Sequence, residues 1–206
     1  MTRQRAAGSG GMLVHSADYL REQGHHATSA QYFVQEMNWG NAAIGKINSV
    51  LHGLEANIAA GASTITDLAF KTPDGKVRPF SLVLANFPFS DELWWLKPEQ
   101  QTDDKKKKDR LKKEVFSKEG YKDLFGRFGR GTAFRRAPPA GYGDYAFVLH
   151  ILASLTDGGR AGIVCPQGVL FRGQPEVEEE TGEFDDDGNP IIKRRKADDE
   201  HLIRQA

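Results

Sequence analysis

The chain has 206 residues, of which 39% are hydrophobic and 27% charged, so it is long enough to bury a sizeable core in one domain. No run approaches the roughly 20 apolar residues of a membrane helix, and an apolar signal segment is not evident near the N-terminus. A single cysteine, Cys165, excludes an internal disulfide and favours a reducing cytoplasm. Because it stands in an apolar run, we expect a small core residue rather than a nucleophile.

The formal net charge is zero, but the charge is unevenly distributed. Residues 97–136 contain 14 Lys/Arg and 7 Asp/Glu, whereas residues 176–200 contain 4 basic and 11 acidic residues. Phosphate binding depends on local patches rather than on the total charge. The neutral total therefore does not exclude a nucleic-acid partner.

Predicted helices and strands alternate along the chain. A glycine-rich loop at 7–11 leads into a helix over 12–21, and these are followed by strand 32–37, helix 41–53, strand 57–60, buried strand 80–85, a charged excursion over 91–140 with a helix within 103–118, helix 145–155, a turn at 157–159 and strand 160–166. Helix 41–53 carries its apolar residues on one face: Ala43, Ile44, Ile47, Val50, Leu51 and Leu54. The alternation predicts a doubly wound α/β sheet.

The last part of the chain differs in composition. Residues 175–199 are acidic, then briefly basic, which predicts a disordered or hairpin-like surface insertion. A helical pattern begins again at 200–206.

Two features at predicted strand ends suit a dinucleotide-like cofactor. The loop with Gly8, Gly10 and Gly11 would let the backbone approach a ligand, although a simple turn has the same composition. Glu36, at the end of the next strand, stands where an acid binds a ribose hydroxyl in Rossmann-like folds. The alternative for Glu36 is a solvated acid at a strand end.

The segment Asn86-Phe87-Pro88-Phe89 directly follows the clearest buried strand, so it is expected at the carboxyl edge of the sheet. Asn86 offers a side-chain carbonyl to an exocyclic N–H, and a neighbouring backbone carbonyl offers a second acceptor. Pro88 stiffens the loop, and Phe89 is suited to stack on an extruded base. The alternative is an ordinary strand-ending turn.

Taken in order, these and later segments resemble the N6-adenine DNA methylase family, specifically the modification (M) subunits of type I restriction-modification systems. The segments that carry the resemblance are Gly8–Val14, Gln35–Asn38, Lys46–Asn48 with Leu51–Gly53, Leu84–Phe89, Asp144–Phe147, His150–Leu152, Gly158–Ala161 and Gly168–Gly173. The collinear set is more specific than any one motif.

The resemblance implies a Rossmann-like S-adenosylmethionine-dependent methyltransferase fold, with residues 1–174 as a partial catalytic domain. It implies methylation of adenine N6 in DNA, with Gly8, Gly10, Gly11 and Glu36 binding the cofactor and Asn86, Pro88 and Phe89 holding the adenine. Expected partners are DNA and the specificity (S) and restriction (R) subunits of a type I system, without a membrane.

The sequence departs from the family pattern at several positions. Gln4 stands where the family has an acid that contacts the methionine part of the cofactor, and Arg5 replaces a proline. No acid stands at 61–63, where the family's adenine-contacting acid is expected, and Asp67 is the nearest. Phe87 replaces the first proline of the catalytic loop. We also expect the first strand of the sheet to be missing, as in an internal fragment, and S-adenosylmethionine to bind weakly or not at all.

Two alternatives to the leading function remain at this point. The same loop chemistry suits methyltransferases that act on RNA bases or protein glutamine, and a catalytically inactive remnant is the reading that the departures favour. Spacing predicts no metal site. Trp94 and Trp95 are expected to pack, and the lysine run 105–113 to form a solvated helix face. The better nucleic-acid candidates are basic residues interleaved with aromatic ones: Arg127, Arg130, Arg135 and Arg136, with Phe125, Phe128 and Phe134.

Overall fold

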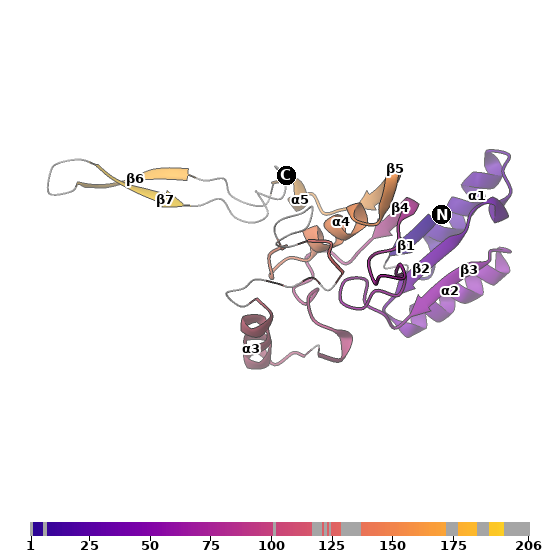
Figure 1. The fold of residues 1–206 in the computed structure, drawn as a ribbon, viewed down its shortest axis with the longest axis horizontal. Coiled ribbons are helices and arrows are strands. Elements are labelled where there is room, and N and C mark those ends of the chain that lie inside the picture. Colours follow the sequence, from indigo (N-terminus) through magenta and orange to yellow (C-terminus); the bar gives the residue numbers. More distant parts are fainter. Residues whose placement is uncertain are drawn as a thin grey trace.

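The computed structural model of the chain describes residues 2–5, 8–100, 102–116, 121, 123, 125–128, 137–171, 177–184 and 190–195. A five-stranded parallel sheet forms its centre, with strand order β3-β2-β1-β4-β5 (Figure 1). The strands are β1 (Thr2–Arg5), β2 (Tyr32–Glu36), β3 (Ala56–Ala60), β4 (Phe80–Asn86) and β5 (Leu155–Val164).

The central strand of the sheet is β1, and its presence overturns the expectation of a missing first strand. Its backbone pairs with β2 on one side and with β4 on the other, with Gln4 opposite Val34 and Leu84. The segment has the sequence Thr-Arg-Gln-Arg, which carries no apolar strand pattern. Parallel pairing uses backbone groups, so a polar segment completes the ladder when strands lie on both sides of it.

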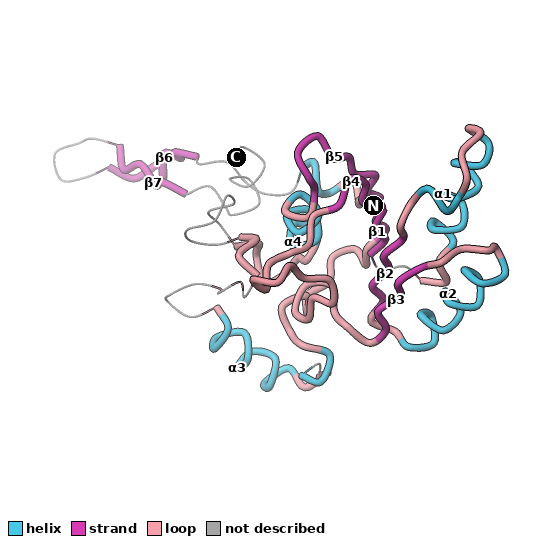
Figure 2. Tube along the Cα trace, turned by 45° about the vertical axis from the view of Figure 1, so that its right-hand side comes forward, coloured by secondary structure: helices cyan, strands magenta, loops and turns pink. Residues whose placement is uncertain are grey.

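Helices cover both faces of the sheet, as in a doubly wound fold. Helices α1 (Gly11–Glu22) and α2 (Trp39–Leu51) lie on one face, and α4 (Asp144–Leu152) lies on the other (Figure 2). The remaining elements are the turns η1 (Ala27–Ser29) and η2 (Pro98–Gln100), the helices α3 (Lys105–Val115) and α5 (Gly168–Phe171), and the antiparallel pair β6 (Val177–Phe184) and β7 (Pro190–Arg195).

Two hydrophobic clusters lie on the two sides of the sheet. The smaller one joins α1 to β2 and includes Leu13, Ala17 and Val34. The larger one is rich in aromatic residues and contains Trp94 and Trp95, which are 2% and 5% exposed, as expected for packing residues. This cluster packs the long 87–143 segment against α4 and so fixes the loops that follow β4.

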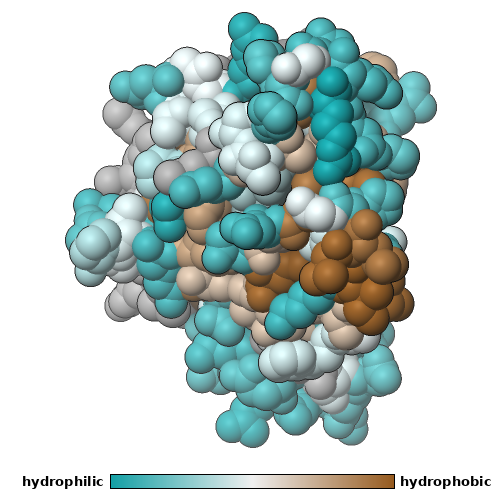
Figure 3. All heavy atoms as spheres, turned by 90° about the vertical axis from the view of Figure 1, so that its right-hand side faces the viewer, coloured by the Kyte–Doolittle hydropathy of each residue, from teal (hydrophilic) through white to brown (hydrophobic). Residues whose placement is uncertain are grey.

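Helix α2 buries a face of small residues, while its large apolar residues lie on the exposed face. Its buried residues are Ala42, Gly45 and Ser49. Large apolar side chains point outward instead, and Figure 3 shows a hydrophobic patch on this side of the molecule: Ile44, Ile47, Val50 and Leu51 are 48%, 59%, 76% and 75% exposed. An amphipathic helix ordinarily buries its apolar stripe.

Cys165 lies just beyond β5 and is exposed, so the prediction of a core residue was wrong. Among the described strands β5 pairs with β4 alone, so it lies at the edge of the sheet, where one side of the strand has no neighbouring strand. The thiol group itself is partly buried, and this desolvation, followed by the nearby Asp144 charge, raises its pKa. The thiol is therefore less reactive than an ordinary one.

Candidate functional site

A pocket of about 290 Å³ lies at the carboxyl edge of the sheet, where ligands bind in open α/β folds. Its walls come from the segments that follow four strands in turn. The lining residues are Gly8, Glu36, Met37, Asn41, Ser63, Thr64, Ile65, Pro88, Asp91, Leu93, Trp94, Leu96 and Phe147. Three of the residues predicted from sequence, Gly8, Glu36 and Pro88, thus line one cavity.

The carboxylate of Glu36 joins the loop after β1 to the start of α2. Its Oε2 accepts the Gly8 N–H at 3.0 Å, and its Oε1 accepts the Asn38 N–H at 2.8 Å. Glu36 is only 7% exposed, and these two bonds fix its orientation at the pocket wall. A carboxylate oxygen has more than one lone pair, so each oxygen still has capacity to accept a ligand hydroxyl.

The glycine loop is held against α2 by close backbone contact. Gly10 has φ +82°, and a Cβ built on it would stand 3.3 Å from the Cα of Gly45. Asn48 Nδ2 donates to the Ser9 carbonyl at 2.8 Å. Small residues on this face of α2 permit the approach, and the bulky residues of the helix lie on its other face. Gly10 and Gly11 do not line the pocket, and Gly11 begins α1.

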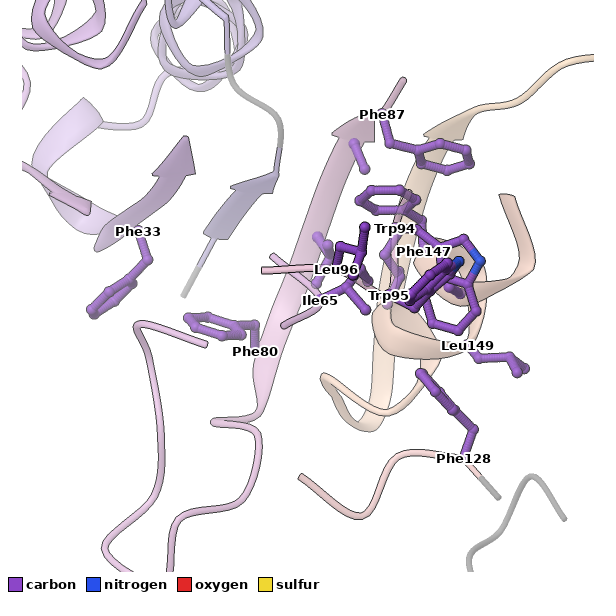
Figure 4. Close-up of a cluster of buried hydrophobic side chains, with 14 residues drawn as sticks. Phe33, Ile65, Phe80, Phe87, Trp94, Trp95, Leu96, Phe128, Phe147 and Leu149 are labelled. Carbon is purple, nitrogen blue, oxygen red and sulfur yellow. The ribbon is translucent and has the colours of Figure 1, made fainter. Parts of the chain in front are cut away.

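The loop that follows β4 places its residues in different surroundings. Asn86 ends the strand and is exposed, and Phe89 is 47% exposed. Phe87 turns into the core, where its ring stacks on Phe147 at 4.8 Å between centroids and an interplanar angle of 5° (Figure 4). The loop is therefore anchored through Phe87, while the flanking residues stay accessible.

A buried acid that sequence reasoning missed holds the end of this loop. Ser90 has φ 55°, and its N–H donates to Asp144 Oδ1 at 2.9 Å. Asp144 is fully buried and is the first residue of α4, where a negative charge is favoured by the helix dipole. The acid two residues before an apolar helix run was the available signal.

Arg127 is buried, so the prediction that it contacts nucleic acid was wrong. Its guanidinium pairs with Asp123 at 2.7 Å, and each side chain is 1% exposed. It also donates to the Ile65 carbonyl at 2.7 Å and to His150 Nδ1 at 2.8 Å. Arg127 therefore fastens the pocket wall at Ile65 to α4. Phe128, 1% exposed, is likewise a core residue, and Arg130, Phe134, Arg135 and Arg136 lie outside the described residues.

Because an arginine only donates, His150 Nδ1 must accept this bond and Nε2 must carry the ring proton. Within the described part of the chain, Nε2 is buried and has no hydrogen-bond partner. Leaving such a donor unpaired costs about 1–3 kcal/mol, which the surrounding network offsets.

The turn that follows β3 lines the pocket through Ser63 and Thr64 rather than through an acid. Ser63 Oγ accepts the Ile65 and Thr66 N–H groups at 3.3 and 3.2 Å, which fixes the turn. Asp67 is exposed and does not line the pocket, so it does not replace the expected acid.

A larger cavity, about 650 Å³, lies at the opposite edge of the sheet. Residues at the amino ends of β2 and β3 line it, including Tyr32, Ala56 and Asn57. Ligands of open α/β sheets bind at the carboxyl ends, where the predicted residues also meet. We therefore take the smaller pocket as the candidate functional site.

A sequence model of the family described as N-6 DNA Methylase matches residues 3–180. The chain belongs to the N-6 DNA methylase family. The matched range contains the pocket and all the site residues predicted from sequence. Within the described residues there is no His/Cys/Asp/Glu group able to hold a metal ion, and the helices described there are too short or too polar to cross a bilayer.

Individual proteins place the chain within this family. The type I restriction enzyme MjaIX methylase subunit of Methanocaldococcus jannaschii is 26% identical over 176 residues, which cover 84% of this chain and 26% of that protein. The chain is thus related to type I methylase subunits and spans about a quarter of the length of this relative.

The fold is similar to those of solved methyltransferase structures. A putative class I S-adenosylmethionine-dependent methyltransferase from Listeria monocytogenes has a TM-score of 0.50 and 10% identity, covering 96% of this chain and 54% of that one. The type I restriction enzyme EcoKI M protein has a TM-score of 0.47 and 18% identity, covering 94% and 38%. The predicted methyltransferase fold is confirmed, with its first strand present.

Proposed function

We infer that the chain carries the catalytic site of an S-adenosylmethionine-dependent methyltransferase that acts on adenine N6 in DNA. One observation carries the inference: a single pocket joins Glu36 and Gly8, on the β1–β2 side, to Pro88 of the loop after β4. A cofactor site and a base-binding loop are thus adjacent, which methyl transfer requires.

The residues present fit the cofactor. Glu36 has both oxygens oriented by backbone amides, as a ribose-binding acid needs. At Gly10, a Cβ would stand only 3.3 Å from the Cα of Gly45, so a residue without a side chain suits this position of the loop. The expectation of weak binding rested on a missing strand, and β1 supplies that strand. When bound, S-adenosylmethionine supplies an electrophilic methyl group on its sulfonium.

The loop after β4 supplies the groups that hold the target nitrogen. The side-chain carbonyl of Asn86 accepts one N–H of the adenine amino group, and the backbone carbonyl of Phe87 or Pro88 accepts the other. Accepting both hydrogens directs the nitrogen lone pair toward the methyl group. Phe89, half exposed beside them, is suited to stack on the extruded base. Phe87, stacked on Phe147, keeps this arrangement rigid.

The relative from M. jannaschii is named as a subunit of a type I restriction enzyme. We infer that this chain likewise works with a specificity subunit, which would read the DNA sequence, and with a restriction subunit. The lysine-rich helix α3 is exposed among the described residues and is available for phosphate contacts.

The test is methyl transfer from labelled S-adenosylmethionine to DNA that lacks adenine methylation, with the specificity subunit present. We expect Asn86→Ala to lower the rate by about 100-fold or more, the usual effect of removing one aligned hydrogen-bonding group. Asn57→Ala, an exposed asparagine on β3 outside the pocket, is the matched control and should leave the rate unchanged.

Equal rates for the wild type and Asn86→Ala would refute the role of Asn86. Label found in RNA or in protein glutamine, but not in DNA, would move the chain to another substrate class. Cofactor binding without transfer to any of these would indicate an inactive relative.

A further inference from the structure

The pocket contains a second acid, Asp91, that the mechanism above does not use. Its Oδ1 accepts the Leu93 N–H at 2.8 Å. Its Oδ2 makes no hydrogen bond to any described residue. This second oxygen is not fully buried, so its lack of a partner is not that of an atom enclosed in the core. Asp91 lines the pocket, so Oδ2 remains available to a ligand there.

The loop that carries Asp91 is held in place by neighbouring elements. Trp94 Nε1 donates to the Pro139 carbonyl at 3.2 Å, and the Ser90 N–H is bound to Asp144. A Cβ on Gly143 would stand 3.0 Å from the Asp91 carbonyl oxygen, so the two segments are in close contact. A carboxylate on such a fixed loop binds without a large cost in ordering.

The charge of the pocket is entirely acidic. Glu36 and Asp91 are its only titratable lining residues, and no Lys, Arg or His lines it within the described part of the chain. Asp144 adds a third negative charge nearby. Burial, together with the Asp144 charge, raises the pKa of Asp91. A bound cation would relieve this repulsion, since an opposite charge favours the ionised carboxyl.

The two lining acids belong to opposite ends of the site. Glu36 ends β2 and Asp91 follows β4, and β1 lies between these strands. Two strand spacings amount to about 10 Å. If the ribose binds Glu36, the methyl group has to reach the loop after β4, so the sulfonium and the amino-acid part attached to it lie on the β4 side of the pocket. The segment between β1 and α1 brings no acid of its own, because residues 2–10 contain none.

We propose that Asp91 forms an ammonium-binding subsite, which takes the α-ammonium group of the methionine part of S-adenosylmethionine. The proposal rests on the proposed function, because it assumes that Glu36 binds the ribose of the same ligand. Asp91 is a binding residue for the cofactor and plays no part in holding the adenine.

Titration calorimetry with three ligands tests the subsite. S-adenosylmethionine has both the ammonium and the sulfonium, S-adenosylhomocysteine has only the ammonium, and 5′-methylthioadenosine has neither. We expect Asp91→Asn to raise the dissociation constants of the first two ligands by about 10- to 100-fold, the usual effect of losing a hydrogen bond to a charged group. The dissociation constant of the third ligand should stay unchanged. Glu36→Gln should weaken all three. Glu92→Gln, an exposed neighbour outside the pocket, is the matched control.

The outcomes separate the two proposals. Failure of the wild type to bind any of the three ligands would overturn the proposed function and the subsite together. Tight wild-type binding that Asp91→Asn leaves unaffected would overturn the subsite alone. If Asp91→Asn weakened the binding of all three ligands equally, Asp91 would shape the pocket rather than bind the ammonium group, and the subsite would be overturned. Weakening of S-adenosylmethionine only would place Asp91 at the sulfonium. A thermal unfolding curve for each variant confirms that the protein tested is folded.

Discussion

The buried pair of Asp123 and Arg127 offers the sharpest test of the structure. Both side chains are 1% exposed, and the carboxylate accepts from the backbone and the guanidinium of Arg127 and from the Phe128 N–H. Asp123→Ala removes the acceptor but leaves the guanidinium in place, because Ile65 and His150 still bind it. The result is a buried charge without its counterion.

Breaking a buried ion pair from one side costs about 3–5 kcal/mol, whereas replacing both partners with apolar residues is often neutral. A domain of this size has a total free energy of unfolding of about 5–15 kcal/mol, so the single variant should lose about a fifth of it or more. Asp123→Leu combined with Arg127→Met removes the unpaired charge and should recover part of the loss, while the Arg127 and Phe128 N–H groups and the Ile65 carbonyl still lose their partners. Urea unfolding followed by tryptophan fluorescence measures both effects.

The matched control is Asp74→Ala, which removes an exposed carboxylate paired with Lys76 at 3.0 Å. It should leave the urea midpoint unchanged, because an exposed pair is screened by solvent. The reasoning would be refuted if Asp123→Ala cost less than about 1 kcal/mol, or if the double variant were less stable than the single one. Because Arg127 binds the Ile65 carbonyl at the pocket wall, Asp123→Ala should also weaken cofactor binding.

Three further predictions follow from local geometry. Gly10→Ala should destabilise the chain by about 1–3 kcal/mol in urea unfolding, because φ is +82° and Gly45 backbone stands 3.3 Å from the added Cβ; an unchanged midpoint would contradict the close contact. Ile47→Ser should change the free energy of unfolding by no more than about 0.5 kcal/mol, since the side chain is 59% exposed, whereas a loss above about 2 kcal/mol would show that this face is covered. The pKa of Asp91 is raised in the folded state above its ordinary value of 3.8, so the folded state holds the proton to higher pH than the unfolded state does. The free energy of unfolding therefore falls as the pH rises through the raised pKa. Asp91→Asn should remove this loss and unfold at a higher temperature than wild type at pH 7, and a lower temperature would contradict the assigned cause.

Sequence patterns predicted those parts of the fold that depend on local signals. Strand β2 was predicted from its β-branched and aromatic start and its terminal acid, β4 from a nearly continuous apolar run, and α2 from helical periodicity. The family resemblance then placed Gly8, Glu36 and Pro88 together, and the structure brings these three to one pocket. Their roles in binding remain predictions.

The features that the sequence did not predict depend on contacts between segments that are distant along the chain. Strand β1 has no apolar pattern and is recognisable only from its pairing with β2 and β4. Arg127 stands among interleaved basic and aromatic residues, a pattern that is typical of nucleic-acid contacts. Only its bonds to Asp123 and His150 show that it is a buried anchor. Asp91 lay within a segment that was predicted as a charged excursion, and its place in the pocket depends on the aromatic packing of that segment.

The orientation of α2 shows how a ligand-binding loop can determine the packing of a helix. Ala42, Gly45 and Ser49 are three and four residues apart, so they share one buried stripe, and Gly45 in this stripe contacts the loop after β1. A bulky residue at 45 would push the loop away from Glu36, whose carboxylate holds Gly8 at 3.0 Å. Close approach at the site therefore requires small residues on the inward stripe. The apolar residues of the helix then occupy the outward stripe, where periodicity alone would have placed the polar ones.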